Sequence, residues 1–214
     1  MSTFAGIPAA FFPAFLAGMR VNFEIAGIAL LLGIAGGMLL AAARYWGSVA
    51  GMAAGLAVGL MRAAPTFVVM FFLLNATPPG IVSPVMIVAL SLVPYAAAYV
   101  ADGGLDALRA FHAGSHLAAF LILPNIARAF FVLVMSSSAG AAIGVHEGIA
   151  IILQQAQKMP STGGTLMLFA IGIVCFGIPL QTGFVAVRLL HRQLSRIAEH
   201  DPRRTLSAAT GLSR

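Results

Sequence analysis

Long apolar stretches alternate with short polar segments along this chain. No charged residue occurs between Glu24 and Arg44, and residues 25–43 are almost wholly apolar. About 20 such residues are enough for a helix to cross the hydrocarbon core of a bilayer. The pattern recurs, so we expect one all-α, polytopic transmembrane domain over residues 1–214 with five spans. The predicted spans are about 23–44, 47–75, 83–101, 121–144 and 166–188.

Proline and glycine interrupt the pattern at defined points. Pro65 lies inside the second span, and it lacks an amide hydrogen and restricts the residue before it, so the helix should kink or break near Ala64. The segment 75–80 contains two prolines and a glycine, which predicts a turn between the second and third spans. Arginines recur every four residues from Arg188 onward, which predicts that the last helix continues into water.

Glycines spaced by four residues mark one side of the second span. Four residues advance a helix by about 400°, so these glycines form a slowly drifting stripe on one face. Small residues at this spacing let helix backbones approach closely in lipid, and Gly33 and Gly37 do the same in the first span. The stripe predicts packing between spans of this chain, the interpretation we favour, or a subunit interface. Its members are Gly47, Gly51, Gly55 and Gly59.

Composition supports the membrane interpretation. Of the 214 residues, 60% are hydrophobic and 8% are charged, whereas a soluble protein carries about 25% charged residues. The net charge is +6, and the basic residues gather near the C-terminus without an accompanying aromatic–basic surface. This placement favours a membrane surface over nucleic acid as the partner.

The connecting segments differ in charge, which predicts their sides of the membrane. One set holds a single lysine, whereas the other holds Arg44, Arg109 and a basic tail over 189–214. Lys and Arg concentrate on the cytoplasmic side, so we expect the N-terminus outside and the C-terminus inside. The polar stretch at about 103–116, with glycines at 103, 104 and 114 as expected helix breakers, then becomes a cytoplasmic loop.

Several kinds of chemistry are poorly supported. A P-loop needs a lysine followed by Ser or Thr, but the sole lysine, Lys158, precedes Met159, so any ATP would be bound by another polypeptide. His112 and His116 could share a helical face with Asp106 nearby, yet solvated loop histidines are the default interpretation. A serine triplet near the fourth span more often bonds backbone carbonyls than acts as a nucleophile. We therefore expect no catalytic residue, no metal and no cofactor in this chain.

Polar residues at helix breaks or on membrane faces are the candidates for a polar pathway. Ionisable side chains near membrane spans are functional candidates by default, and a broken helix exposes backbone groups that a water-lined cavity can satisfy. The candidates are Arg62, Thr66, Ser137, Ser138 and Glu147.

Five motifs follow one another along the chain. They read Ala17-Gly-Met-Arg-Val-Asn-Phe-Glu-Ile-Ala26, Met61-Arg-Ala-Ala-Pro-Thr-Phe-Val-Val-Met-Phe-Phe72, Ala89-Leu-Ser-Leu-Val-Pro-Tyr-Ala-Ala-Ala-Tyr-Val-Ala-Asp102, Leu121-Ile-Leu-Pro-Asn-Ile-Ala-Arg128 and Ser137-Ser-Ala-Gly-Ala-Ala-Ile-Gly-Val-His-Glu147. In this order they resemble the permease subunits of polar amino acid ABC importers of the histidine/glutamine/arginine/opine type, over about 14–196. The family's second-helix signature Phe-Arg-Gly-Thr-Pro appears with its Arg and Pro kept, as Arg62 and Pro65.

One family feature is reduced in this chain. The cytoplasmic Glu-Ala-Ala loop, which docks into the ATPase subunit, is shorter here and is replaced by Asp106-Ala107-Leu108. The resemblance implies coupling residues at Asp106, Ala107, Arg109 and Gly114. The altered loop suggests that this subunit pairs with a different permease whose loop is intact, giving a heterodimer.

The resemblance also implies an assembly. Its expected partners are a second permease, two ATP-binding subunits that hold ATP and Mg²⁺, and a periplasmic or lipid-anchored substrate-binding protein. The expected location is a bacterial inner membrane, and the expected cargo is a small polar solute such as an amino acid. Two alternatives stay open at this stage: a stand-alone channel or secondary carrier, and a degenerate permease that serves as a structural partner.

Overall fold

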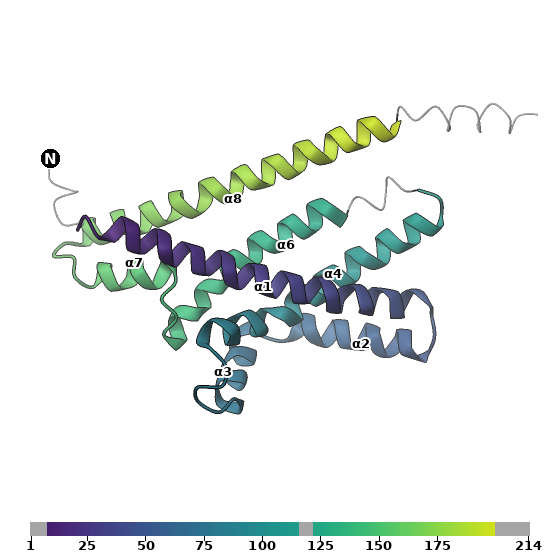
Figure 1. Ribbon diagram of the computed structural model, residues 1–214, viewed down its shortest axis with the longest axis horizontal. Coiled ribbons are helices and arrows are strands. Elements are labelled where there is room, and N and C mark those ends of the chain that lie inside the picture. The colour runs from purple at the N-terminus through teal and green to yellow at the C-terminus, as the bar shows by residue number, and fades with distance from the viewer. Residues whose placement is uncertain (1–7, 116–121, 200–214) are drawn as a thin grey trace, which may run out of the picture.

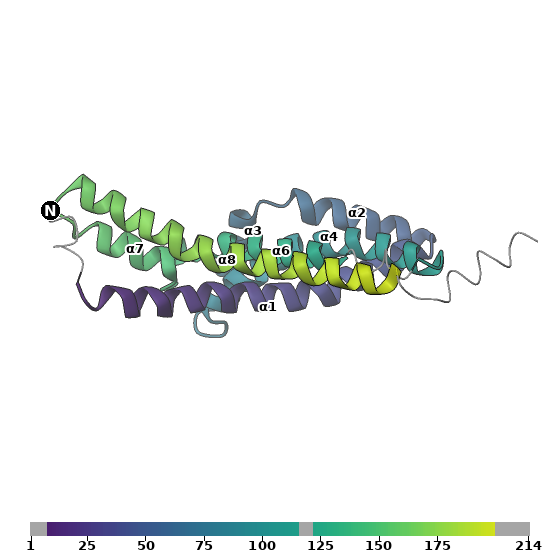
Figure 2. The same cartoon turned by 90° about the horizontal axis from the view of Figure 1, so that it is seen from above.

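The computed structural model describes residues 8–115 and 122–199, with side chains to residue 193, and this part of the chain is helical throughout (Figure 1). Apart from one short helix over Thr66–Ala76, the helices lie roughly along one direction in a long, narrow bundle (Figure 2). The prediction of an all-α fold is confirmed. The helices are α1 (Phe11–Tyr45), α2 (Val49–Ala63), α3 (Thr66–Ala76), α4 (Pro84–His112), α6 (Ile122–Ser136), the 3-10 helix η1 (Ser137–Ile143), α7 (Gly148–Ala156) and α8 (Thr162–Glu199).

Four of these segments are long and apolar enough to cross a membrane alone. They are α1, α4, the continuous run of α6 and η1 over Ile122–Ile143, and α8 over Thr162–Gln193. The α2–α3 pair passes the same test jointly, which gives up to 5 spans. The predicted membrane fold therefore agrees with the helices that the structure contains.

The second span is broken at Pro65, as predicted. Ala64 is extended with ψ 117°, because the proline ring disfavours the helical conformation of the residue before it. Helix α3 begins at Thr66, and its axis is bent 95° from that of α2. Figure 1 shows α3 leaving the bundle at this angle. The segment 47–75 is thus two helices and not one kinked rod.

Helices α1 and α4 form the centre of the bundle. A Cβ on Gly33 would lie 2.4 Å from Ala96 Cβ, and one on Gly37 would lie 2.6 Å from the Ala97 carbonyl oxygen. Since both distances are far below van der Waals contact, only glycine permits this approach of α1 to α4. The expected packing role of Gly33 and Gly37 is confirmed.

Residues 103–112 continue α4, whereas the sequence analysis expected a loop at 103–116. A Cβ on Gly104 would lie 2.9 Å from the Met38 sulfur and 3.1 Å from Ala41 Cβ, so this glycine serves close packing and does not break the helix. The helix ends at His112, and Gly114 follows with φ +80°, a conformation that favours glycine. Of the predicted breakers, Gly114 alone acts as one; residue 116 lies outside the described residues.

Two further boundaries differ from the prediction. Helix α1 begins at Phe11 and not near residue 23, because Phe11 and Phe15 are buried and Phe15 packs edge-on against Phe176 of α8. The polar segment 146–165 contains the short helix α7. Figures 1 and 2 both place α7 beside the beginning of α1. Helix α8 runs on to Glu199, which confirms that the last helix continues beyond residue 188.

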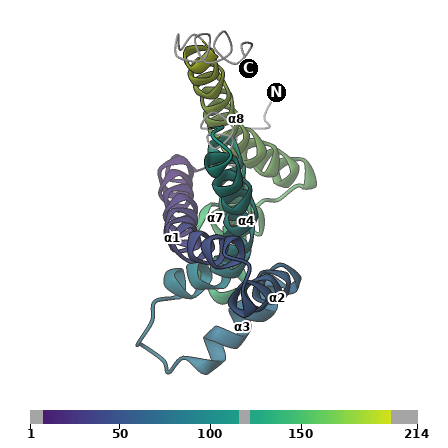
Figure 3. The same cartoon turned by 90° about the vertical axis from the view of Figure 1, so that its right-hand side faces the viewer.

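The glycines of the predicted stripe differ in their environments: one packs against α1, and others line an open groove. A Cβ on Gly51 would lie 3.1 Å from the Ala43 carbonyl oxygen of α1, which fits internal packing, whereas Gly47 adopts φ +62° in the turn before α2. Gly55 and Gly59 meet nothing within 4 Å and line an apolar groove with Met52, Leu56 and Leu60. Viewed along the bundle in Figure 3, α2 and α3 lie at the edge opposite α8. The subunit-interface interpretation of this groove stays a prediction.

Candidate functional site

One carboxylate joins three helices. Asp102 of α4 accepts a hydrogen bond of 2.7 Å from Nη1 of Arg44 on α1, and its second oxygen pairs with the guanidinium of Arg62 on α2. The Asp102 side chain is 40% exposed, and two cations share its single negative charge. A partly exposed pair contributes about 1 kcal/mol or less to stability, so this cluster serves chiefly to orient the three helices.

Arg62 occupies a particular position in this cluster. It lies in the last turn of α2, where a positive charge is favoured by the helix dipole, and directly before the break at Pro65. The Arg62–Asp102 pair therefore fixes the end of α2, from which α3 turns away, onto the middle of α4.

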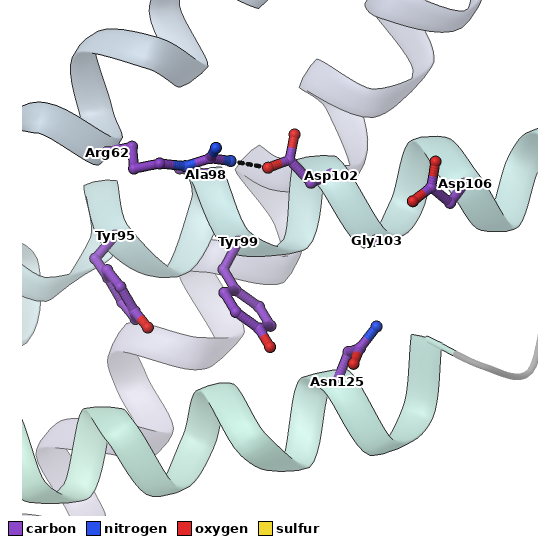
Figure 4. Close-up of a pocket in the computed structure, with 8 residues that line it drawn as sticks. All are labelled: Arg62, Tyr95, Ala98, Tyr99, Asp102, Gly103, Asp106 and Asn125. Carbon is purple, nitrogen blue, oxygen red and sulfur yellow. Dashed lines mark ion pairs between the residues drawn. The ribbon is translucent and has the colours of Figure 1, made fainter.

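A cleft of about 390 Å³ opens beside this pair, between α2, α4 and α6. In Figure 4, Arg62 and Asp102 lie on one side of α4, and the rings of Tyr95 and Tyr99 extend toward Asn125 and α6. The two tyrosine rings are 6.2 Å apart, one helical turn along α4. The cleft thus presents a guanidinium, carboxylates, phenol groups and a carboxamide. It is lined by Arg62, Tyr95, Ala98, Tyr99, Asp102, Gly103, Asp106 and Asn125.

The predicted coupling residues lie on the last turns of α4. Asp106 and Arg109 are highly exposed, and the 4.0 Å between Asp106 Oδ1 and Arg109 Nη1 makes a loose ion pair. Asp106 also lines the cleft, so one residue of the predicted coupling group shares this cleft with Arg62 of the predicted pathway. Ala107 is half-buried on the same turn, and Gly114 ends the helical segment.

A second polar cluster is completely buried near the beginning of α1. Asn22 Nδ2 donates to Ser137 Oγ and to Glu147 Oε2, both at 2.8 Å, and its Oδ1 accepts from the Gly148 amide at 2.9 Å. Glu147 also caps α7, accepting from the amides of Ile149 at 2.8 Å and Ala150 at 2.7 Å. Asn22, Ser137 and Glu147 are each 0% exposed. This Asn22–Glu147 network holds η1 and α7 against α1.

The structure separates the predicted pathway residues into groups. Arg62 lines the cleft, and Thr66 is the first residue of α3, half-buried, across the break from Arg62. Ser137 and Glu147 belong to the Asn22–Glu147 network, and Ser138 is half-buried beside them in η1. Asn22 and Arg44 are 22 residues apart on α1, which corresponds to about 33 Å at 1.5 Å per residue. That length is comparable to the roughly 30 Å hydrocarbon thickness of a bilayer, so the two clusters lie far apart along α1.

Sequence reasoning missed Asp102 and Asn22. Asp102 carried a usable signal, because it is the first acidic residue after a charge-free stretch from 63 to 101. Asn22 carried none, because its partners lie 115 and 125 residues away along the chain.

Of the two histidines considered as ligands, His112 has other contacts, and His116 lies outside the described residues. His112 stacks on Tyr45 with ring centroids 4.7 Å apart, and its Nδ1 lies 2.9 Å from the Leu108 carbonyl oxygen. Within residues 8–115 and 122–199, no group of three potential metal ligands lies together.

These features define a polytopic helical membrane protein with a charged cleft near one face. No family model matches the chain, and no curated protein matches it. It is similar to a chain in a solved structure described as a crystal structure of an amino acid ABC transporter with histidines, with a TM-score of 0.66 and 16% sequence identity. The likeness covers 86% of this chain and 95% of that chain. This chain therefore shares its fold with a chain of that ABC transporter, and its apolar helices make it a multi-pass membrane protein.

Proposed function

We propose that this chain is the transmembrane subunit of an ATP-binding cassette importer and forms part of the pathway for a small polar solute. The likeness in fold over 86% of the chain carries this proposal. The motif order over 14–196 supports the same class independently, since Arg62 and Pro65 lie where the helix break and the cleft meet. The chain itself holds no cofactor in this scheme and catalyses no reaction.

Helix α4 supplies the mechanical link that an importer needs. It carries Tyr95, Tyr99 and Asp102 at the cleft and continues without interruption to Asp106 and Arg109 at its exposed end. A displacement of that end by a partner ATPase would therefore move the cleft as well, because a packed helix transmits motion along its length. We infer that Asp106, Ala107, Arg109 and Gly114 meet the ATPase, which holds the ATP and Mg²⁺.

The charges in the cleft suit a solute that carries both signs. Arg62 can pair with a carboxylate, and Asp106 is 80% exposed and able to accept an ammonium group, while the tyrosines offer hydroxyl groups and apolar ring faces. Amino acids and related compounds fit this description. Thr66 and Ser138 would border the same pathway. Ser137 and Glu147 would act indirectly, because their hydrogen bonds are already used in positioning η1 and α7.

The complete transporter would need further chains. We propose a second permease, a different polypeptide with an intact coupling loop, together with two ATP-binding subunits and a periplasmic or lipid-anchored binding protein in a bacterial inner membrane. The replacement of the family's Glu-Ala-Ala loop by Asp106-Ala107-Leu108 supports the heterodimer, because a partner permease with an intact loop would supply the docking element that is altered here. Copurification with this chain as the sole membrane species of an active transporter would contradict it.

Reconstitution tests the function directly. The chain is assembled in proteoliposomes with the permease, ATPase and binding protein encoded beside it, and uptake of labelled amino acids is measured with and without internal ATP. We expect ATP-dependent uptake that Arg62→Gln abolishes and Lys158→Gln, on the opposite membrane face, leaves unchanged. Uptake by this chain alone would identify a stand-alone carrier. ATP-dependent uptake that survives replacement of residues 106–114 by a Gly/Ser linker would remove the coupling assignment and indicate a structural partner.

A further inference from the structure

We propose that the cytoplasmic end of the seam between α6 and α8 binds an anionic phospholipid headgroup. The seam is fixed by two aromatic residues. The rings of Phe131 on α6 and Phe184 on α8 meet edge-on with centroids 6.0 Å apart, and a Cβ on Gly183 would lie 3.3 Å from the Phe131 ring. The two helices therefore pack against each other at this level.

Three arginines lie just beyond this contact. Arg128 precedes Phe131 by three residues, and Arg188 follows Phe184 by four, so each shares a helical face with its phenylalanine. Figure 1 shows α6 and α8 running in opposite directions. One turn backward along α6 and one turn forward along α8 consequently lead toward the same end of the seam. Arg192 lies one turn further along α8.

The guanidinium groups are available to a ligand. The Arg188 guanidinium carbon lies 4.7 Å from the centre of the Phe184 ring, which orients this side chain along the seam. Arg128, Arg188 and Arg192 are all exposed. Among the side chains that the structure describes, no carboxylate lies within 4.0 Å of any of these arginines. None of the described carboxylates therefore compensates their positive charge at close range.

The surface below the arginines is apolar and open. Of an 18-residue apolar stretch of α8, only 17% is buried. Ile178 is 61% exposed, Val185 42% and Leu189 53%. Acyl chains can lie along this surface while the phosphate above them pairs with the guanidinium groups. A phospholipid can pair with the arginines and cover the apolar surface at the same time. Free phosphate would pair only with the arginines, and an apolar partner helix would cover only the apolar surface. Basic pockets between transmembrane helices on the cytoplasmic side bind anionic headgroups in this manner.

Lipid binding to the full-length protein tests this seam. The purified chain in detergent is titrated with phosphatidylglycerol or with phosphatidylcholine, and bound lipid is counted by native mass spectrometry. We expect phosphatidylglycerol to bind at least about tenfold more tightly. Each arginine near a charged lipid surface contributes about a fivefold gain in affinity. The triple variant R128Q/R188Q/R192Q should therefore lose the preference for phosphatidylglycerol.

A matched control removes the same number of charges elsewhere. The variant R203Q/R204Q/R214Q takes three arginines from the tail outside the described residues, and it should keep the preference. Equal affinity for both lipids in the unaltered protein would overturn the proposal, as would equal losses in the two triple variants. Displacement of the lipid by inorganic phosphate at the same concentration would also overturn it.

A crosslinking experiment keeps the proposal testable if the triple variant does not fold. The unaltered protein is mixed with phosphatidylglycerol that carries a photoreactive group on one acyl chain, and the crosslinked peptides are identified. Adducts on 174–193 and 122–135 are expected. Adducts confined to other helices would contradict the proposal, and so would a partner chain covering these residues in the assembled transporter.

Discussion

The ion pair between Arg62 and Asp102 ties the broken second span to α4, the helix that also carries Asp106 and Arg109. Arg62 is the third residue before Pro65, where the axis turns by 95°, and Asp102 lies on α4 between the cleft tyrosines and Asp106. This pair is thus positioned to link the conformation at the break with movement of α4.

Removing the charge at Asp102 tests that link. In Asp102→Asn, Arg44 and Arg62 face each other without their shared carboxylate, which should cost about 1 kcal/mol of stability because the cluster is partly exposed. In the reconstituted transporter we expect uptake to fall at least about tenfold while ATP hydrolysis continues. The measurement is the ratio of solute transported to ATP hydrolysed. A ratio that does not change would exclude a coupling role for Asp102.

Glu147→Gln should destabilise the protein clearly. Its two carboxylate oxygens accept hydrogen bonds from Asn22 and from the amides of Ile149 and Ala150, and a glutamine amide nitrogen cannot accept. A buried unsatisfied donor costs about 1–3 kcal/mol. Thermal unfolding in detergent measures the effect. Glu24→Gln is the matched control, because Glu24 is an exposed carboxylate on α1 and should tolerate the same change.

Gly33→Ala should weaken the contact between α1 and α4. The new methyl group would lie 2.4 Å from Ala96 Cβ, so the helices must separate, and such overpacking costs about 1–3 kcal/mol. Gly27→Ala on the same helix meets nothing within 4 Å and should be neutral or slightly stabilising. Equal unfolding temperatures for the two variants would show that α1 and α4 are less closely packed than described.

The double variant Asp106→Ala/Arg109→Ala should reduce capture of the ATPase subunit without altering the fold. Both side chains are more than half exposed and their 4.0 Å pair adds less than about 1 kcal/mol, so unfolding should hardly change. Pull-down of the purified ATPase subunit by this chain measures the expected loss, of at least about tenfold. Lys158→Ala, in the segment between α7 and α8, serves as the control, and undiminished capture by the double variant would place the docking surface elsewhere.

The helical membrane fold could be predicted because hydropathy reports directly which stretches prefer lipid. The break at Pro65 could be predicted as well, since proline acts on its own local backbone. The expectation that Gly103 and Gly104 break the helix was wrong, because it considered only the local backbone. Gly104 instead lies where α4 packs closely against Met38 and Ala41 of α1. Asn22 escaped prediction for a similar reason, since its partners come from the other end of the chain.

The candidate site was predicted only in pieces. Arg62 was singled out for its charge beside the helix break and Asp106 through the family resemblance to a coupling loop, so the two were assigned to separate roles. Once α4 continues as one helix, they line the same cleft. Ser137 and Glu147 were chosen for polarity in the membrane, a signal that does not distinguish a pathway from a hydrogen-bond network closed within the fold.

The distance along α1 between Asn22 and Arg44 is fixed by the helix. Its polar anchors are about 33 Å apart, and the close glycine contacts with α4 prevent either helix from shortening or sliding alone. We therefore expect a thinner bilayer to be matched by tilt of the α1–α4 pair as one body, and a thicker bilayer to thin around it. Because α4 lines most of the cleft, the inclination of the cleft should change with the thickness of the surrounding lipid.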